Sequence, residues 1–284
     1  MHWILDALGS AFFVRALLGG ALVAVTCGVV GTWVVIRGMA FLGEAIGHGM
    51  LPGVAIATLV GVPPVVGGAV SAITMSALIS TLQRRGKLSY DTSIGLLFVA
   101  MLATGVIIVS HSGSFATDAT ALLFGDVLAI SAASVWLLAG VAVATCAIAY
   151  ACHRAFVALA FDPRVASSLG YRPRRAQATL VGLVALAVVA SAQAVGTLLV
   201  VALLLGPAVA AQPWRTGIPA RMVLAACLGA AAVVTGLAIS WLAGSAAGST
   251  IAATSIAVAA LSHLARTARR ASPSAAPALA QSTH

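Results

Sequence analysis

Charged residues are scarce in this sequence. Of its 284 residues only 7% are Asp, Glu, Lys or Arg, whereas a soluble domain carries about 25%. Only six residues are acidic, 61% are hydrophobic, and the mean hydropathy is +1.11. A globule of this size could not cover its surface with so few ionised groups, so the composition excludes a soluble enzyme, a disordered regulator and a secreted disulfide scaffold. The sequence predicts a polytopic membrane protein.

Motifs that would mark an enzyme or a cofactor site are also missing. There is no GxxxxGK[ST] phosphate loop, because the sole Gly-Lys pair, Gly86-Lys87, is followed by Leu88. There is no HExxH motif, and the four cysteines have no CxxC spacing, which favours small buried hydrophobic residues over a metal site or disulfides. We therefore expect no catalytic residue, no resident cofactor and no ATP hydrolysis by this chain. The basic-then-apolar order of a cleavable signal peptide is absent, since Asp6 precedes the first cation, Arg15.

Long apolar runs separated by short connections make up most of the chain. Each run is long enough, or nearly so, to cross the hydrocarbon as a helix of about 20 residues, and helix is the only option for such runs in lipid. The sixth and seventh runs are broken only by Gln193 and Gly196, so one of them could be a half-span. The sequence thus predicts an all-α, polytopic transmembrane helical bundle of eight or nine spans, forming one transmembrane domain over residues 1–265. The runs lie at residues 12–36, 39–61, 63–83, 93–110, 132–151, 176–194, 196–212, 220–243 and 249–265.

The cations are placed asymmetrically along the chain. With nine spans, Lys and Arg fall in alternate connections, while residues 62–64, 111–131 and 244–248 contain none. Positive residues mark cytoplasmic loops, so we expect an external N-terminus and a cytoplasmic C-terminus. Because the cations are scattered, the net charge of +9 does not indicate nucleic-acid binding. Residues 266–284 are rich in Ala, Ser and Pro and are predicted to be a disordered basic cytoplasmic tail.

One segment places ionisable residues inside an apolar run. Glu44 and His48 are four residues apart, so on a helix they share one face, about 6 Å apart along the axis. A carboxylate and an imidazole at this spacing can both bind one divalent first-row cation. Glycines at positions 43, 47, 49 and 53 would leave one helical surface bare, for a second helix or for an ion path. The alternative is a purely structural hydrogen bond between Glu44 and His48.

Four segments, in order, resemble the metal-ion ABC-transporter permeases, a family that serves zinc, manganese or iron uptake. Residues 42–53 (LGEAIGHGMLPG) resemble its L-x-G-D-A-x-S-H-A-x-L-P-G signature. Residues 122–130 (LLFGDVLAI) resemble L-F-G-[DN]-I-L-A-V, and residues 195–208 (VGTLLVVALLLGPA) resemble V-G-x-L-L-V-x-A-L-L-x-x-P-A. The stretch at 161–170 matches an F-D-P…L-G cytoplasmic loop. The similarity covers roughly residues 12–265.

The resemblance implies a type II ABC-importer-like permease that works as a homodimer in a bacterial-type plasma (inner) membrane. It implies a pair of ATPase subunits on the cytoplasmic face, which bind the ATP, and an extracytoplasmic metal-binding protein that delivers the ion. The family's Asp and His map to Glu44 and His48, which would be the metal residues of a zinc or manganese path. Two departures stand out: Glu44 replaces Asp, and Gly47 replaces the usual Ser.

The same resemblance indicates where the partners would bind. The ATPase would dock on the cytoplasmic loops at about 161–175 and 206–221. Asp118 and Asp126 could meet the loaded binding protein, although solvated loop carboxylates would look the same in sequence. His111, His153 and His263 are expected to have no role in transport.

Two other function classes are alternatives to an ABC permease. An ion-coupled secondary metal transporter generally needs more intramembrane carboxylates or a repeat of half-helices, and Glu44 is alone within the spans. An intramembrane protease would need a nucleophile with a base, and no such arrangement is present. Dependence on ATP and on a separate ATPase subunit distinguishes the first class from the other two.

Overall fold

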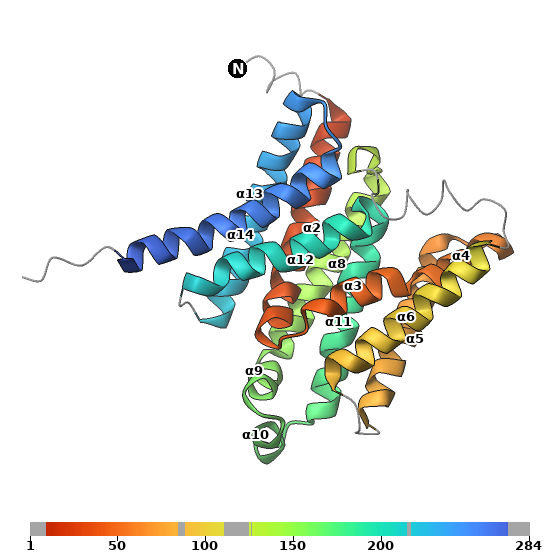
Figure 1. Cartoon of the computed structure of the whole chain (residues 1–284), viewed down its shortest axis with the longest axis vertical. Helices are drawn as coiled ribbons and strands as arrows, with labels where there is room; N and C mark the ends of the chain where they lie inside the picture. Colours follow the sequence, from red (N-terminus) through yellow and green to blue (C-terminus); the bar gives the residue numbers. More distant parts are fainter. Residues whose placement is uncertain (1–9, 85–88, 111–124, 126, 215–216, 272–284) are drawn as a thin grey trace, which may run out of the picture.

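The computed structural model describes residues 10–84, 89–110, 125, 127–214 and 217–271, and every regular element within them is a helix (Figure 1). Nine helical segments of this part are long and apolar enough to cross a membrane, which confirms the all-α bundle and selects nine spans over eight. The elements are α2 (Ala11–Ile36), α3 (Ala40–Gly49), α4 (Leu51–Val60), α5 (Pro64–Arg84), α6 (Tyr90–Ser110), η1 (Val127–Ala129), α8 (Ala132–Ala151), α9 (His153–Phe161), α10 (Pro163–Ser168), α11 (Pro173–Val195), α12 (Thr197–Ala211), η2 (Gln212–Trp214), α13 (Ile218–Ala243) and α14 (Ala247–Ala271).

The second span is built from two helices rather than from the single run expected at 39–61. α3 ends at Gly49 and α4 begins at Leu51, with Met50 between them. Pro52 explains the joint, because it has no backbone N–H for the carbonyl four residues earlier and its ring crowds that carbonyl. At the start of α4 the missing N–H costs little.

The seventh span is short, as the sequence allowed. α12 has 15 residues, which is about 22 Å of helix against a hydrocarbon core of about 30 Å. It follows α11 directly across Gly196, whose φ of 85° and ψ of 153° suit glycine alone. Thr197 at the start of α12 faces Gly47, near the middle of the span over residues 40–60. The α11–α12 turn therefore lies inside the bundle.

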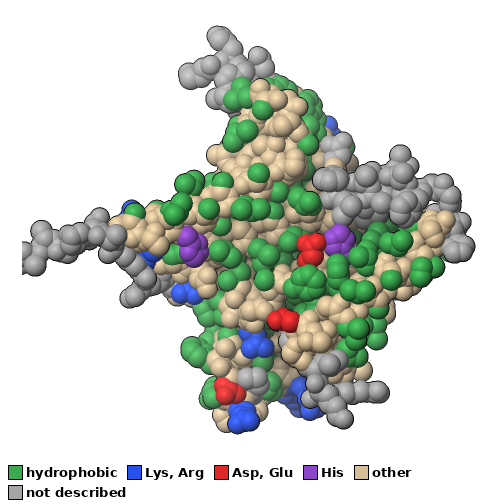
Figure 2. All heavy atoms as spheres, viewed as in Figure 1, with side chains coloured by type: hydrophobic (Ala, Val, Ile, Leu, Met, Phe, Trp, Pro, Cys, Tyr) green, Lys and Arg blue, Asp and Glu red, His purple; other side chains and the backbone are tan. Residues whose placement is uncertain are grey.

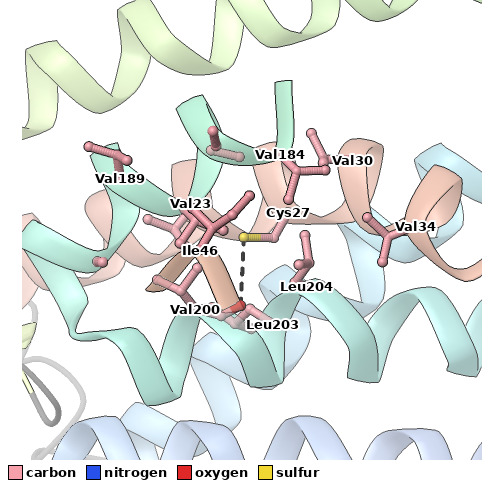
Figure 3. Close-up of a cluster of buried hydrophobic side chains, with 14 of the residues drawn as sticks. Val23, Cys27, Val30, Val34, Ile46, Val184, Val189, Val200, Leu203 and Leu204 are labelled. Carbon is pink, nitrogen blue, oxygen red and sulfur yellow. Dashed lines mark hydrogen bonds between the residues drawn. The ribbon is translucent and has the colours of Figure 1, made fainter. Parts of the chain in front are cut away.

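α2 forms the centre of the bundle and packs against α8, α12 and α13. Small residues bring the helices close together, and a Cβ on Gly31 would collide with the Leu204 carbonyl. In lipid such close packing replaces the hydrophobic effect as the main force between helices. The Cys27 thiol of α2 donates a hydrogen bond to the Val200 carbonyl of α12, with an S–O distance of 3.9 Å. Figure 3 shows the surrounding apolar cluster, which includes Val23, Val30, Val34, Ile46, Val184, Val189, Leu203 and Leu204.

Helices α4, α5 and α6 form a second group beside α3 and α11 (Figure 1). Where α4 crosses α5, Gly53 and Gly67 face each other so closely that a Cβ on either would collide with the other's carbonyl. Outward side chains such as Val70 and Ile73 are apolar and exposed. In Figure 2 few charged side chains interrupt this apolar surface, as expected for helices that face lipid.

Hydrogen bonds from Arg37 join three elements at one end of the bundle. Arg37 follows the last residue of α2 and donates to the Leu159 carbonyl of α9 at 2.6 Å. It also donates to Oε1 of Gln177 on α11 at 3.0 Å. The same short helices and the start of α11 also carry Arg154, Arg164, Arg172, Arg174 and Arg175. The contact fixes the short helices α9 and α10 relative to the spans.

The boundary predicted at residue 265 falls inside a helix. α14 continues through Arg266 and Arg269 to Ala271, because no helix-breaking residue intervenes. Residues 272–284 lie outside the described residues, so the disordered tail stays a prediction there. All four cysteines are free thiols: Cys27 is buried, Cys146 and Cys152 are half-buried, and Cys227 is exposed on the outside of the bundle.

Candidate metal site

Glu44 and His48 lie on one face of α3, as the sequence predicted. Nε2 of His48 is 2.9 Å from Oε1 of Glu44, one helical turn away. The His48 side chain is 21% exposed and the Glu44 side chain 38% exposed, so neither is sealed in the core. The hydrogen bond that a purely structural role would require is therefore present, but both side chains that form it are partly exposed.

The pair opens into a cavity of about 350 Å³ between α3, α12 and α14. Apart from Glu44 and His48, the lining has one further side chain with a polar group, Thr197 at the start of α12. The remaining lining residues are Leu198, Val201, Ala202, Leu205, Gly206, Ala252 and Ile256. An apolar wall around a few converging polar groups is the usual form of a small-ligand site. Because the pair lines a cavity, it differs from a hydrogen bond between two side chains packed in a core.

An aromatic ring from α6 lies against the histidine. The Phe98 ring lies edge-on to the His48 ring, with centroids 5.8 Å apart and planes inclined by 72°. Phe98 in turn packs against Phe41, at the start of α3, with centroids 5.3 Å apart. These contacts restrict the imidazole to one orientation along α3.

The four glycines of this segment do not form the single bare helical surface that the sequence predicted, because they face two different neighbouring helices. Gly43 and Gly47 face the α12 side, where a Cβ on Gly43 would lie 2.5 Å from Leu204 Cδ2. Gly49 and Gly53 face α5. The close approach of other helices is thus confirmed, and the glycines themselves line no cavity with the pair.

The donor set can hold a metal only incompletely within one chain. A carboxylate oxygen and an imidazole nitrogen suit zinc, manganese and iron alike. Among the described residues there is no group of three or more His, Cys, Asp or Glu side chains that could hold an ion. Such a site suits an ion that must leave again, because a closed four-ligand cage would retain it.

The other sequence candidates are not brought to this cavity. Asp118, Asp126 and His111 lie outside the described residues. His153 packs its ring against Trp33, with centroids 5.6 Å apart, and His263 contacts the Val209 carbonyl at 3.3 Å. Neither histidine lines the cavity with Glu44 and His48, and the expectation that they have no transport role stays a prediction.

Sequence reasoning missed Thr197 and Phe98 as members of the site. Thr197 lies in the segment at 195–208 that resembles the permease family, but nothing in its spacing relative to Glu44 indicates a shared cavity. Phe98 sits in an ordinary apolar run. Only the packing of α6 and α12 against α3 brings them together.

Two surfaces lie at the loops expected to dock an ATPase. Around α10 and the start of α11, a hollow of about 700 Å³ is lined by Arg164, Ser167, Tyr171, Arg172, Pro173, Arg174 and Arg175. Beside it Phe161 and Leu169 are 82% and 63% exposed. The four arginines and the apolar side chains together form what is here called the arginine surface.

The second loop is held against α14. Nε1 of Trp214 in η2 donates to Oγ of Ser262 at 2.9 Å, and the Arg269 guanidinium lies 5.3 Å from the Trp214 ring centroid. Ser262 also donates to the Ala210 carbonyl at 2.6 Å, which satisfies one of the free carbonyls at the end of α12. The first part of the loop after α12, which is η2, is therefore anchored on α14.

Comparison with known proteins identifies the family. Residues 10–266 match the model of the ABC 3 transport family. The chain is 32% identical over 219 residues to the manganese transport system membrane protein MntC of Halalkalibacterium halodurans, covering 77% of this chain and 75% of that protein. It is 33% identical over 215 residues to the manganese import system permease protein ScaB of Streptococcus parasanguinis, covering 76% of each.

A solved structure of the same kind agrees over nearly the whole fold. In the structure of PsaBC from Streptococcus pneumoniae in complex with Fab, one chain superposes with a TM-score of 0.80 at 30% identity. The match covers 91% of this chain and 93% of that one. These matches confirm the resemblance read from the four sequence segments and the fold that it implied. The chain is a multi-pass bacterial plasma-membrane protein that belongs to the ABC 3 transport family.

Proposed function

We propose that this chain is the membrane-spanning permease subunit of a binding-protein-dependent ABC importer for a divalent transition metal. The observation that carries the proposal is the Glu44–His48 pair on a cavity between α3, α12 and α14. An ionisable pair within a membrane span is costly unless it is paired, hydrated or functional. Here the two side chains are hydrogen-bonded to each other and also line a cavity, which suits an ion that passes through.

Manganese is the cargo best supported, with zinc as the second choice. Both curated relatives described above are named for manganese transport or import. A hard carboxylate and a borderline imidazole form a mixed donor set that accepts Mn²⁺ and Zn²⁺. Intrinsic affinity favours zinc, so selection of manganese would depend on geometry, on the donors that complete the shell and on availability.

The energy would come from a pair of cytoplasmic ATPase subunits. The sequence has no phosphate loop of its own. The arginine surface and the anchored loop after α12 offer a basic, partly apolar docking area for them. An extracytoplasmic metal-binding protein would deliver the ion from the other side, where the loop connections lack Lys and Arg.

Pairing of two copies of the chain is a further part of the proposal. One chain supplies a single carboxylate and a single imidazole, and Glu44 is 38% exposed. Two copies meeting along this face would bring two of each to a shared axis. The mass of the purified complex, measured by light scattering with detergent correction, tests this point.

Reconstitution in proteoliposomes tests the function as a whole. The chain, its co-expressed ATPase subunit and the binding protein loaded with radioactive manganese would be required together. We expect metal to accumulate inside only with ATP. Accumulation driven by a proton or sodium gradient without ATP would instead support the ion-coupled secondary transporter.

A further inference from the structure

Thr197 has a buried hydroxyl without a partner. The residue is only 5% exposed, and its Oγ1 makes no hydrogen bond within the described structure. A buried hydroxyl left unpaired costs on the order of 1–3 kcal/mol, so such groups are rare and call for a physical explanation. The hydroxyl belongs to the residue that lines the cavity together with Glu44 and His48.

The helix break at Gly196 explains why the hydroxyl is free. The two buried threonines of α2 donate to the carbonyl four residues earlier, Thr26 to Leu22 at 2.9 Å and Thr32 to Gly28 at 2.7 Å. Thr197 is the first residue of α12, and the chain turns at Gly196 with a φ of 85°. The carbonyl four residues earlier therefore belongs to another helix, α11, and the usual acceptor is lost.

The side chain lies against the turn of α3 that carries the histidine. A Cβ built on Gly47 would be 3.6 Å from both Cβ and Cγ2 of Thr197. Gly47 immediately precedes His48, and the resemblance to the family places a serine at this position. The structure thus has Thr197, a residue with a hydroxyl, on α12 beside the position where the family pattern has a serine on α3, and its Cβ and Cγ2 methyl are the atoms nearest to Gly47.

We propose that the Thr197 hydroxyl is a third oxygen or nitrogen donor of the metal path, binding the passing ion or a water in its shell. The inference rests on the proposed function and extends it to a residue on a second helix. A hydroxyl is a hard, neutral oxygen donor, and hard oxygen ligands suit Mn²⁺ better than they suit Zn²⁺. Thr197 is accordingly a specificity-determining residue that favours manganese.

The test removes the hydroxyl while keeping the shape. Thr197→Val is close to isosteric, Thr197→Ala removes the hydroxyl in a smaller side chain, and Thr197→Ser keeps it. Thr145→Val on α8 is the matched control, because Thr145 is also fully buried with an unpartnered hydroxyl but does not line this cavity. Uptake of radioactive manganese and zinc is measured in proteoliposomes with the ATPase subunit, over a range of loaded binding protein.

For Thr197→Val and Thr197→Ala we expect the KM for manganese to rise about three- to tenfold, which corresponds to about 0.7–1.4 kcal/mol, with a smaller rise for zinc. Thr197→Ser should stay within about twofold of the unchanged chain, as should Thr145→Val. Two hydroxyl-free variants keep the test valid if one of them fails to fold.

Three results would overturn the inference. One is a manganese KM that stays the same in both hydroxyl-free variants, in an assay in which the chain without substitutions transports manganese. Another is a rise in the manganese KM that Thr197→Ser shares with the hydroxyl-free variants, which would indicate that the side chain acts through packing rather than through its hydroxyl. An equal rise for both metals would remove the role in specificity. If the unchanged chain shows no ATP-driven uptake, the proposed function itself fails, which distinguishes the two.

Discussion

Gly125 packs directly on Gly196, so closely that a Cβ on Gly125 would collide with the Gly196 backbone nitrogen. Gly125 belongs to the connection before η1, and Gly196 is the turn between α11 and α12. A little further along that connection, a Cβ on Gly19 of α2 would lie 2.8 Å from Ile130 Cδ1. Gly125 and Ile130 of this connection therefore lie against the bundle, and Gly125 touches the turn next to Thr197. Non-helical backbone at this depth is tolerated where it is buried in protein or lines a cavity.

Alanine substitutions at three glycines should change the stability of the protein in a graded series. Gly140→Ala, within α8 and with nothing near its Cβ position, should be neutral or slightly stabilising. Gly38 has a φ of 65° but open space, so Gly38→Ala should cost about 1 kcal/mol from backbone strain alone. Gly125→Ala combines a φ of 57° with a backbone collision and should cost more than either. Thermal unfolding of the purified protein in detergent gives the order, and equal melting temperatures for Gly38→Ala and Gly125→Ala would contradict the close packing on Gly196.

The membrane orientation should follow the positions of Lys and Arg. In a background without the four native cysteines, Ser245→Cys lies in a connection without cations and Gln212→Cys follows α12. In intact cells a membrane-impermeant maleimide should label the cysteine at 245 and leave the one at 212 unlabelled. Permeabilised cells supply the control, in which both should react. The opposite pattern in intact cells would reverse the topology.

Charge reversal on the arginine surface should weaken binding of the ATPase subunit. Arg172 and Arg174 line the hollow beside α10 and carry no described acidic neighbour in it. Arg172→Glu combined with Arg174→Glu should lower the ATPase retained on the purified permease by about two- to tenfold, and more so at low salt. Arg15 lies near the start of α2, at the other end of that helix from Arg37. Arg15→Glu should therefore leave the amount of retained ATPase unchanged. Full retention by the double variant would move the docking site elsewhere.

The loop after α12 allows a more direct check of the docking area. Gln212 is exposed at the start of η2, and its neighbour Trp214 is anchored to Ser262. A cysteine at 212 should therefore cross-link to cysteines placed on the co-expressed ATPase. If cross-links formed only from the segment beyond Ala271, both proposed docking loops would be wrong.

The sequence predicted a helical bundle of eight or nine spans because isolated apolar runs have no alternative to helix in lipid, and the structure was needed to select nine. The spacing of Glu44 and His48 was predictable for the same reason, since helix geometry fixes their common face. The neighbours of the pair were not predictable. Thr197 and Phe98 reach the site through the packing of α12 and α6 on α3, and in lipid that packing depends on small residues and shape rather than on hydrophobic pattern. The joint at Met50 had a local cause in Pro52, which hydropathy alone does not weigh.

The central claim is that Glu44 and His48 bind the metal ion during transport, and uptake of radioactive manganese by four variants tests it most directly. Glu44→Gln and His48→Gln can still hydrogen-bond within α3 but lose a charged or a strong nitrogen ligand. Glu44→Asp restores the carboxylate that the family pattern carries. With expression and complex yield matched, we expect uptake to fall more than about tenfold in both Gln variants and in His48→Ala, a loss of more than about 1.4 kcal/mol, and to persist in Glu44→Asp. Normal uptake by both Gln variants would contradict the account and leave the pair as a structural hydrogen bond.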